Sequence, residues 1–309
     1  MKIEPYKGVR DFYPSEMAIQ NYIFSVWRSV AEKFGYVEYS ASILEYAELY
    51  RNKGSDEIVN DQMYVFKDKG DREVALRPEM TPTLARMIAA QRRSLKFPLR
   101  WYSVPNVFRY ERPQRGRRRE HWQLNCDLMG IAGLEAEVEI ISLALSIMKA
   151  FGAKDEDFQI QLNDRAHSET EVLKLLKDSS DLSNAMRLID KANKIPKEEF
   201  SAEWVKLSDK PFTIPAGEHL NGLLSKLREK GIENIVYAPE VVRGFDYYTG
   251  MVFEVFDTNP ENRRSLFGGG RYDNLLEMFG VEPVPTVGFG MGDVTVLDFL
   301  TTHNLPLKK

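Results

Sequence analysis

Cysteine and histidine are scarce in this sequence: of its 309 residues, one is cysteine and four are histidine. The single thiol, Cys126, cannot form an intramolecular disulfide, and the histidines are scattered without the spacing of a metal site. Such low use of cysteine is typical of proteins in a reducing compartment. We therefore expect a cytoplasmic protein that holds no structural metal.

Long hydrophobic runs and an excess of positive charge are missing as well. No stretch of about 18 apolar residues could span a membrane, and the first five residues lack the apolar region of a signal peptide. The formal net charge is −4, whereas proteins that only coat nucleic acid are usually basic. These absences argue against a membrane protein and a general nucleic-acid coat, so any contact with RNA must use a local patch.

The remaining composition, 43% hydrophobic and 28% charged, is that of an ordinary globular protein. Apolar spacing predicts helices at 14–34, 81–93, 134–151, several between 168 and 230, 272–279 and 293–302. It predicts strands at 36–44, 64–66, 73–76, 100–109, 122–129, 158–162, 235–238, 251–256 and 286–290. This order predicts an α+β fold, in which helices flank a mostly antiparallel sheet. Dense charge from 168 to 232 indicates a helical insertion between core segments 1–167 and 233–309.

An arginine-rich loop connects two of the expected strands. Six arginines lie between Phe108 and Glu120, and guanidinium groups offer forked donors to phosphate oxygens. The following strand alternates Gln123, Asn125 and Asp127, which therefore share one face. An arginine run is often only a solvated loop, but the polar strand face beside it favours a site for a phosphorylated ligand.

Three further segments could bind a ligand, although each also has a purely structural interpretation. In 76–82, a glutamate and a threonine between prolines could bind an ammonium group, or the threonine could cap a helix. In 242–250, two tyrosines, a cation and an anion lie between glycines, as in a ligand pocket or an aromatic strand edge. In 267–273, three glycines precede an expected helix, where they could offer amide donors or form a turn.

In their order and spacing, these four segments resemble histidyl-tRNA synthetases, which are class II aminoacyl-tRNA synthetases. The likeness covers nearly the whole chain from 8–11 onward. Segment 108–130 is similar to the second class II signature, and segments 243–250 and 268–273 resemble two histidine-specific motifs. The resemblance implies a class II fold, a homodimer, and ATP bound with Mg²⁺. It also implies that L-histidine is activated as histidyl-adenylate and transferred to the acceptor end of tRNA(His).

The resemblance assigns roles to individual residues as well. Arg109 and Arg243 are the expected catalytic residues, with Arg109 on the α-phosphate and Arg243 beside the α-phosphate and the carboxylate. The expected ATP contacts are Arg109, Glu111, Arg117 and Arg119, of which Arg117 and Arg119 fall in a loop that reaches ATP and tRNA. The expected histidine contacts are Glu79, Thr81, Gln123, Asp127, Arg243, Tyr247, Tyr248 and Tyr272. No protein side chain is expected to bind a metal ion directly.

The sequence departs from the family pattern in three places. Asp127 stands where many bacterial members carry glutamate, and Thr295 stands where the third class II motif ends in an arginine. The chain also stops where family members continue into an anticodon-binding domain, so we expect that domain to be absent. This last departure keeps open an alternative, the histidine-sensing regulatory subunit of ATP phosphoribosyltransferase, which does not charge tRNA. A structural protein without a site is disfavoured by the four ordered motifs.

Overall fold

The computed structural model describes the whole chain except residues 1–2, 52–57, 194, 244–246, 263 and 309. Its centre is a nine-stranded sheet with the order β1-β5-β7-β12-β11-β10-β8-β9, and β6 pairs beside β7. The strands are β1 (Val37–Glu38), β5 (Leu99–Ser103), β6 (Asn106–Phe108), β7 (Glu120–Met129), β8 (Phe158–Asp164), β9 (Ile235–Tyr237), β10 (Met251–Asp257), β11 (Ser265–Arg271) and β12 (Thr286–Gly292). Only the outer pairs β1–β5 and β8–β9 are parallel, so the predicted mostly antiparallel α+β fold is confirmed.

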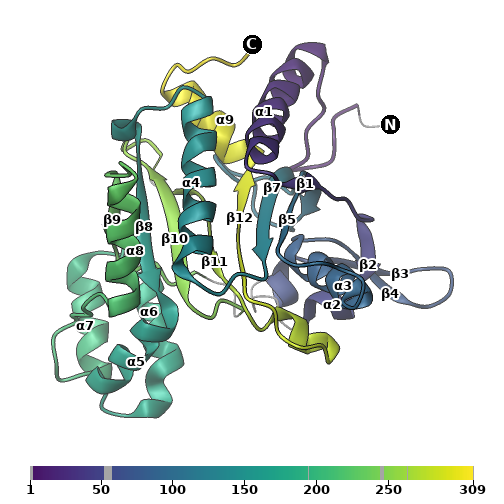
Figure 1. The fold of residues 1–309 in the computed structure, drawn as a ribbon. Coiled ribbons are helices and arrows are strands. Elements are labelled where there is room, and N and C mark those ends of the chain that lie inside the picture. The colour runs from purple at the N-terminus through teal and green to yellow at the C-terminus, as the bar shows by residue number, and fades with distance from the viewer. Residues whose placement is uncertain (1–2, 52–57, 194, 244–246, 263, 309) are drawn as a thin grey trace.

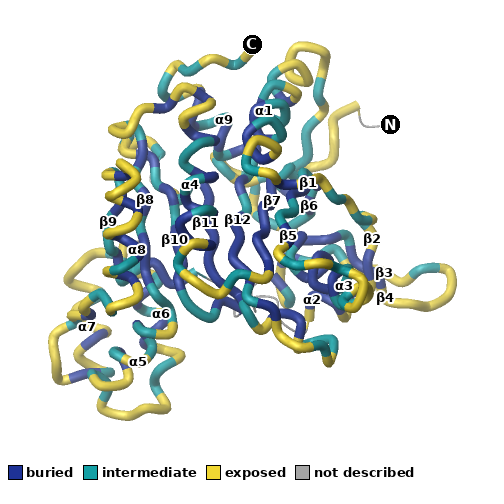
Figure 2. Tube along the Cα trace, viewed as in Figure 1, coloured by how far each residue is buried: buried dark blue, intermediate teal, exposed yellow. Residues whose placement is uncertain are grey.

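Four helices cover one face of this sheet (Figure 1): α1 (Pro14–Lys33), α4 (Leu134–Ala150), α8 (Glu218–Glu229) and α9 (Asp293–Thr302). Their apolar sides meet every second residue of the central strands, such as Leu124, Cys126 and Leu128 of β7. These residues form the main hydrophobic core, and Figure 2 shows the central strands as buried. The opposite face of the central strands is therefore left for other groups.

A second, three-stranded sheet has the order β2-β4-β3 and stands beside the large one. It consists of β2 (Leu44–Tyr46), β3 (Tyr64–Lys67) and β4 (Glu73–Leu76). Helices α2 (Glu48–Arg51) and α3 (Thr81–Gln91) lie next to it, and the short π-helical segment η1 (Ile58–Gln62) directly precedes β3. Apolar residues of α3 join Leu99, Met129 and a group of tyrosines in a second core on the face of the large sheet that the four helices leave uncovered.

The helical segment in the second half of the chain has its own small core. It contains α5 (Arg165–Leu175), α6 (Leu182–Asp190) and α7 (Lys197–Leu207), which pack around Val172, Ile189 and Trp204. The next helix, α8, instead packs against α4 in the main core. Three short 3₁₀ turns complete the described elements: η2 (Asp155–Asp157), η3 (Ser179–Asp181) and η4 (Leu275–Phe279).

Four expected elements differ from the structure. The strand expected at 36–44 is two short strands, β1 and β2, in different sheets, and the strand expected at 100–109 is divided into β5 and β6. Pro105 lies at the second break, because proline has no N–H for the ladder. The glycines at 268–270 are not a turn before a helix but the middle of strand β11, and the helix expected at 272–279 shortens to η4. No helix in the described ranges is both long and apolar enough to cross a membrane.

Candidate active site

The uncovered face of the large sheet has a floor made of glycines. In β7, Gln123, Asn125 and Asp127 point to this face, and their cross-strand partners in β12 are glycines. The next strand, β11, adds more bare backbone, so the floor consists of Gly268, Gly270, Gly288, Gly290 and Gly292. A Cβ on Gly288 would lie 2.6 Å from Asp127 Oδ1, and a Cβ on Gly290 would lie 2.5 Å from Gln123 Nε2. The glycines therefore leave the space that the polar side chains occupy.

A cleft opens over this floor and brings together nine of the twelve predicted site residues: Glu79, Thr81, Arg109, Gln123, Asp127, Arg243, Tyr247, Tyr248 and Tyr272. The predicted site residues did not include five others that line the cleft: Asn125, Gly268, Gly288, Phe289 and Gly290. The alternation of Asn125 with its neighbours and the repeat of glycine at every second position of β12 were the signals that could have identified them. Residues 244–246, within the segment 242–250, lie outside the described part of the chain.

Glu79 is a buried carboxyl at one end of the cleft, in the connection between β4 and α3. It is 3% exposed, and its Oε2 accepts a hydrogen bond of 3.3 Å from Tyr247. Its Oε1 is buried and has no hydrogen-bond partner in the described structure. Burial raises the pKa of Glu79 to about 7, although Arg109 nearby opposes the shift. A ligand that brings a positive donor, such as an ammonium group, would satisfy the free oxygen.

Thr81 is the first residue of α3, and the residue that caps this helix is Met80, whose side chain makes no capping hydrogen bond. The alternative interpretation of Thr81 as a helix cap is therefore wrong. Since Thr81 lines the cleft beside Glu79, its hydroxyl lies where it can meet a ligand.

The other end of the cleft combines a second buried carboxyl with three tyrosines. Asp127 is 3% exposed and accepts a hydrogen bond from the Tyr272 hydroxyl. Burial raises the pKa of Asp127 to about 7. The rings of Tyr247 and Tyr248 lie 4.9 Å apart between centroids, and Tyr272 meets Tyr247 edge to face at 5.5 Å. This arrangement suits a small planar group that carries a hydrogen-bond donor.

Two arginines supply positive charge to the same cleft. Arg109 follows β6, and its Nε donates a 2.8 Å hydrogen bond to the Pro78 carbonyl. Arg243 has a φ of 61°, which is uncommon for a residue other than glycine, and its Nη1 lies 2.8 Å from Glu254 Oε1. The cleft can therefore hold an anionic group near these two guanidinium groups.

The three other predicted ATP contacts lie outside this cleft. Arg117 pairs with Glu111 at 3.1 Å. Arg119 is buried, with its guanidinium carbon 3.8 Å from the centre of the Tyr110 ring and its Nη1 donating to the Tyr6 hydroxyl. Arg119 thus connects the base of the hairpin to the N-terminal segment. The assignment of these three residues to ATP stays a prediction.

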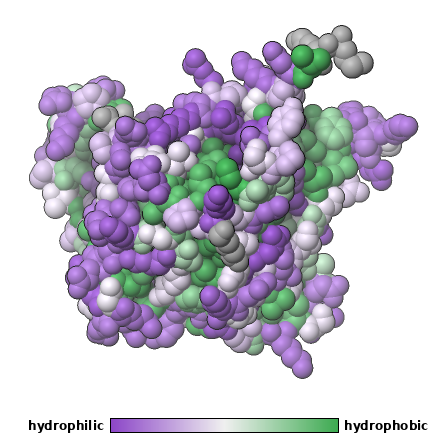
Figure 3. Space-filling view, turned by 90° about the horizontal axis from the view of Figure 1, so that it is seen from above, coloured by the Kyte–Doolittle hydropathy of each residue, from purple (hydrophilic) through white to green (hydrophobic). Residues whose placement is uncertain are grey.

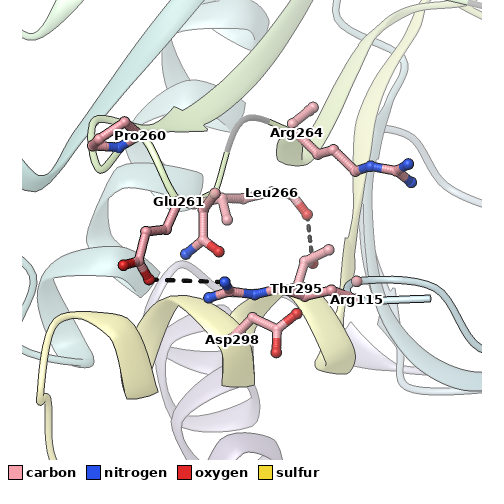
Figure 4. A pocket seen from close by; sticks show the side chains of 10 residues that line it. Arg115, Pro260, Glu261, Arg264, Leu266, Thr295 and Asp298 are labelled. Atoms are coloured by element: carbon pink, nitrogen blue, oxygen red, sulfur yellow. Dashed lines mark hydrogen bonds and ion pairs between the residues drawn. The ribbon is translucent and has the colours of Figure 1, made fainter.

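Thr295 faces a second pocket, between α9, the tip of the arginine hairpin and the β10–β11 connection (Figure 4). The Thr295 hydroxyl donates to the Leu266 carbonyl at 2.6 Å, so it is already engaged within the protein. Arg115 from the hairpin crosses above α9, where it donates to Thr302 at 3.0 Å and lies 3.9 Å from Glu261. The tip of the hairpin therefore covers the helix at the place where the resemblance leads one to expect an arginine.

Comparisons with known proteins agree with this architecture. A sequence profile of the family described as histidyl-tRNA synthetase matches residues 8–167 and 166–294. A histidine–tRNA ligase of Leptospira biflexa is 46% identical over 98% of this chain and 75% of its own length. The solved histidyl-tRNA synthetase of Nostoc has a TM-score of 0.83 at 22% identity, covering 100% of this chain and 78% of that one.

A second solved structure bears on the alternative function. It is described as an ATP phosphoribosyltransferase regulatory subunit/histidyl-tRNA synthetase from Bacillus halodurans, with a TM-score of 0.80 at 22% identity, covering 94% of this chain and 80% of that one. At this identity the likeness shows a shared fold only. It therefore does not favour the regulatory alternative, whereas the Leptospira relative, with twice the identity, carries the name of a ligase.

Proposed function

The chain belongs to the histidyl-tRNA synthetase family, and we propose that it activates L-histidine with ATP and transfers it to the 3′ end of tRNA(His). The observation that supports this most directly is the single cleft that unites two arginines, two buried carboxyls and three tyrosines. These groups correspond in kind to the three polar parts of histidine: an ammonium, a carboxylate and an imidazole.

We propose that histidine lies along the glycine floor. Its ammonium group meets the free oxygen of Glu79, with Thr81 and Gln123 close by. Its imidazole enters among the tyrosines and donates to Asp127. Its carboxylate then points to the two arginines. An apolar amino acid of similar size would offer the buried carboxyl of Asp127 no donor beyond the Tyr272 hydroxyl, which is the kind of mismatch that gives strong selectivity.

In the proposed first step, a carboxylate oxygen of histidine attacks the α-phosphorus of ATP, and the bond from this phosphorus to the pyrophosphate breaks. Negative charge builds up on the phosphate oxygens, which Arg109 and Arg243 stabilise. No general base is needed because the carboxylate is already ionised. In the second step, a hydroxyl of the terminal ribose of tRNA attacks the carbonyl carbon of the adenylate and AMP leaves.

ATP is the second substrate, and Mg²⁺ would arrive on its phosphates. The described residues contain no cluster of three or more side chains suited to a metal ion, and Mg²⁺ is often held mainly by phosphates and water. In this proposal the hairpin arginines Arg115, Arg117 and Arg119 would meet the polyphosphate of ATP and the end of the tRNA. We also propose that 168–232 is an insertion into a catalytic core formed by 1–167 and 233–309.

The test of this function is histidine-dependent exchange of labelled pyrophosphate into ATP. We expect the purified chain to catalyse the exchange with histidine and Mg²⁺, and not with alanine or phenylalanine. A chain that binds histidine in calorimetry but gives no exchange would instead match the regulatory alternative and would refute the proposal.

Filling the glycine floor should impair histidine binding without unfolding the chain. In Gly290→Ala, the three atoms nearest to the new methyl group belong to the side chains of Gln123 and Asn125, which can move aside. We expect the KM for histidine to rise on the order of tenfold, with little change in melting temperature. In the matched variant Gly269→Ala, the methyl group would lie 2.0 Å from the Gly288 carbonyl oxygen, so this change should lower the melting temperature instead.

We propose further that the chain forms a homodimer through the side that carries β1 and the small sheet. Five large apolar side chains are exposed there, namely Val37, Leu44, Tyr46, Val65 and Phe66, and Figure 3 shows apolar surface on this side of the molecule. A grouping of this kind is typical of a protein interface. Sedimentation equilibrium should give twice the chain mass, and a monomer at micromolar concentration would contradict the proposal.

A further inference from the structure

Arg243 is held in the cleft by few strong contacts. Its Nη2 is 3.5 Å from both the Tyr248 hydroxyl and the Gly268 carbonyl, distances at the limit of a hydrogen bond. Its Nε is buried and has no hydrogen-bond partner among the described residues. Within the described part of the chain, the one short hydrogen bond of its guanidinium group is the 2.8 Å bond to Glu254. The orientation of this group therefore depends mainly on one carboxylate.

The position of Glu254 in the sheet keeps its carboxylate in one place beside Arg243. It lies in the middle of β10, where it is paired with Gln161 of β8 on one side and Gly268 of β11 on the other. The side chains of Arg243 and Glu254 are only 15% and 23% exposed, so water competes little with their ion pair. A rigid, partly buried strand position holds a partner more firmly than a loop position does.

Gly268 allows this contact. A Cβ at this position would lie 2.6 Å from Arg243 Nη1 and 3.1 Å from Glu254 Cγ. The guanidinium group thus lies across the bare backbone of β11 to reach the carboxylate. The first glycine of the 268–270 triplet therefore has a specific use, which a turn before a helix would not explain.

We propose that Glu254 is a positioning residue, which holds the Arg243 guanidinium in the direction required to meet the reacting phosphate and carboxylate. The inference rests on the proposed function, because it assigns to Glu254 an effect that passes through Arg243. The negative charge of Glu254 partly offsets the positive charge of Arg243 and so weakens the attraction of Arg243 for a phosphate. Glu254 therefore contributes by orienting the guanidinium group. Misplacement of a catalytic group by about 1 Å can cost on the order of 100-fold in rate.

The test is a double-mutant cycle in the pyrophosphate exchange assay. We expect Glu254→Ala to lower kcat by about 10- to 100-fold with little change in the KM for histidine. Glu254→Gln keeps an oxygen that can accept from Nη1 and should lose less. In Arg243→Ala, the further change Glu254→Ala should have almost no effect, because the group that it positions is gone.

Glu139→Ala is the matched control. Glu139 also pairs with an arginine, since Arg100 Nε lies 2.7 Å from its Oε1 and the two side chains are 30% and 22% exposed. It extends from α4, on the other side of the sheet. This variant should change the melting temperature about as much as Glu254→Ala and leave kcat as it is.

The outcomes of the double-mutant cycle distinguish the positioning role of Glu254 from the proposed function. Additive losses in the double variant would show that Glu254 acts independently of Arg243 and would overturn the positioning role alone. Equal losses in Glu254→Ala and Glu254→Gln would show that its charge matters and not its hydrogen bond, which also overturns the inference. A wild-type chain without exchange activity would overturn the proposed function and the positioning role with it. If Glu254→Ala does not fold, Glu254→Gln and its double variant with Arg243→Ala give the same cycle.

Discussion

Arg243→Ala is expected to lower histidine-dependent pyrophosphate exchange on the order of 100- to 1000-fold, the effect of removing one fixed donor to a charged transition state. Arg109 and Arg243 are the cations that line the described part of the cleft. Arg243 lines it together with Tyr247 and Tyr248 of its own segment. The loss should appear in kcat more than in the KM for histidine, because charge on the phosphate oxygens grows as the reaction proceeds.

The fold should survive this substitution. Arg243 contributes no large apolar surface to a core, and once its guanidinium group is removed, water can take its place beside the Glu254 carboxylate, which is 23% exposed. We expect circular dichroism and the melting temperature to stay close to those of the wild-type chain. Arg243→Lys should recover only part of the activity, since an ammonium group lacks the forked donors of a guanidinium. Full exchange activity in Arg243→Ala would remove this residue from the mechanism.

The sequence predicts best those elements whose local pattern and tertiary setting agree. Helix α9 has the predicted bounds, 293–302, because an apolar face begins directly after the glycine that ends β12. The alternation in β7 correctly predicts that Gln123, Asn125 and Asp127 share a face, because the side chains of a strand alternate whatever its neighbours are.

Elements defined by their neighbours were harder to predict. Three consecutive glycines usually indicate a turn, and only the flanking strands β10 and β12 explain why 268–270 is extended. Likewise, no local signal shows that Arg119 stacks on Tyr110 or that the hairpin tip lies on α9. The first contact depends on how the hairpin closes at its base, and the second joins segments that are distant in sequence, Arg115 and Thr302.

Thr295 raises the question of what replaces the missing arginine of the third motif. In the structure, Thr295 is small enough for the hairpin tip to approach α9: a Cβ on Gly116 would lie 3.7 Å from its methyl group. An arginine at this position would extend into the space that the tip now covers. The hairpin and α9 thus fit together as a unit, and positive charge near the second pocket comes from Arg115 and Arg264 in place of the helix.

Asp127→Asn is expected to lower kcat/KM for histidine about 10- to 100-fold, which corresponds to the loss of one hydrogen bond to a charged group. The amide has nearly the shape of the carboxylate, so it should fit beside Gly288 and leave the glycine floor intact. Tyr272→Phe removes a different hydrogen bond, the one from the Tyr272 hydroxyl to Asp127, and leaves the carboxylate for the imidazole, so it should cost less. Equal kcat/KM values for wild type and Asp127→Asn would exclude Asp127 as the residue that recognises the imidazole.

The pH dependence of stability separates this effect from a damaged fold. The pKa of Asp127 is raised from 3.8 to about 7 in the folded chain, so the unfolded chain releases this proton at lower pH than the folded one does. Between about pH 4 and pH 7 the carboxyl therefore makes the free energy of unfolding fall as the pH rises, and above pH 7 the loss is complete.

Asparagine does not titrate, so the Asp127→Asn variant should be at least as stable as the wild-type chain at pH 8. When the pH is lowered from 8 to 5, the free energy of unfolding should rise less in the variant than in the wild-type chain. Thermal unfolding of both chains at these two pH values measures the difference, in which the equal contribution of Glu79 cancels. A variant that is less stable at pH 8 would show that its loss of activity comes from the fold and not from the missing contact with histidine.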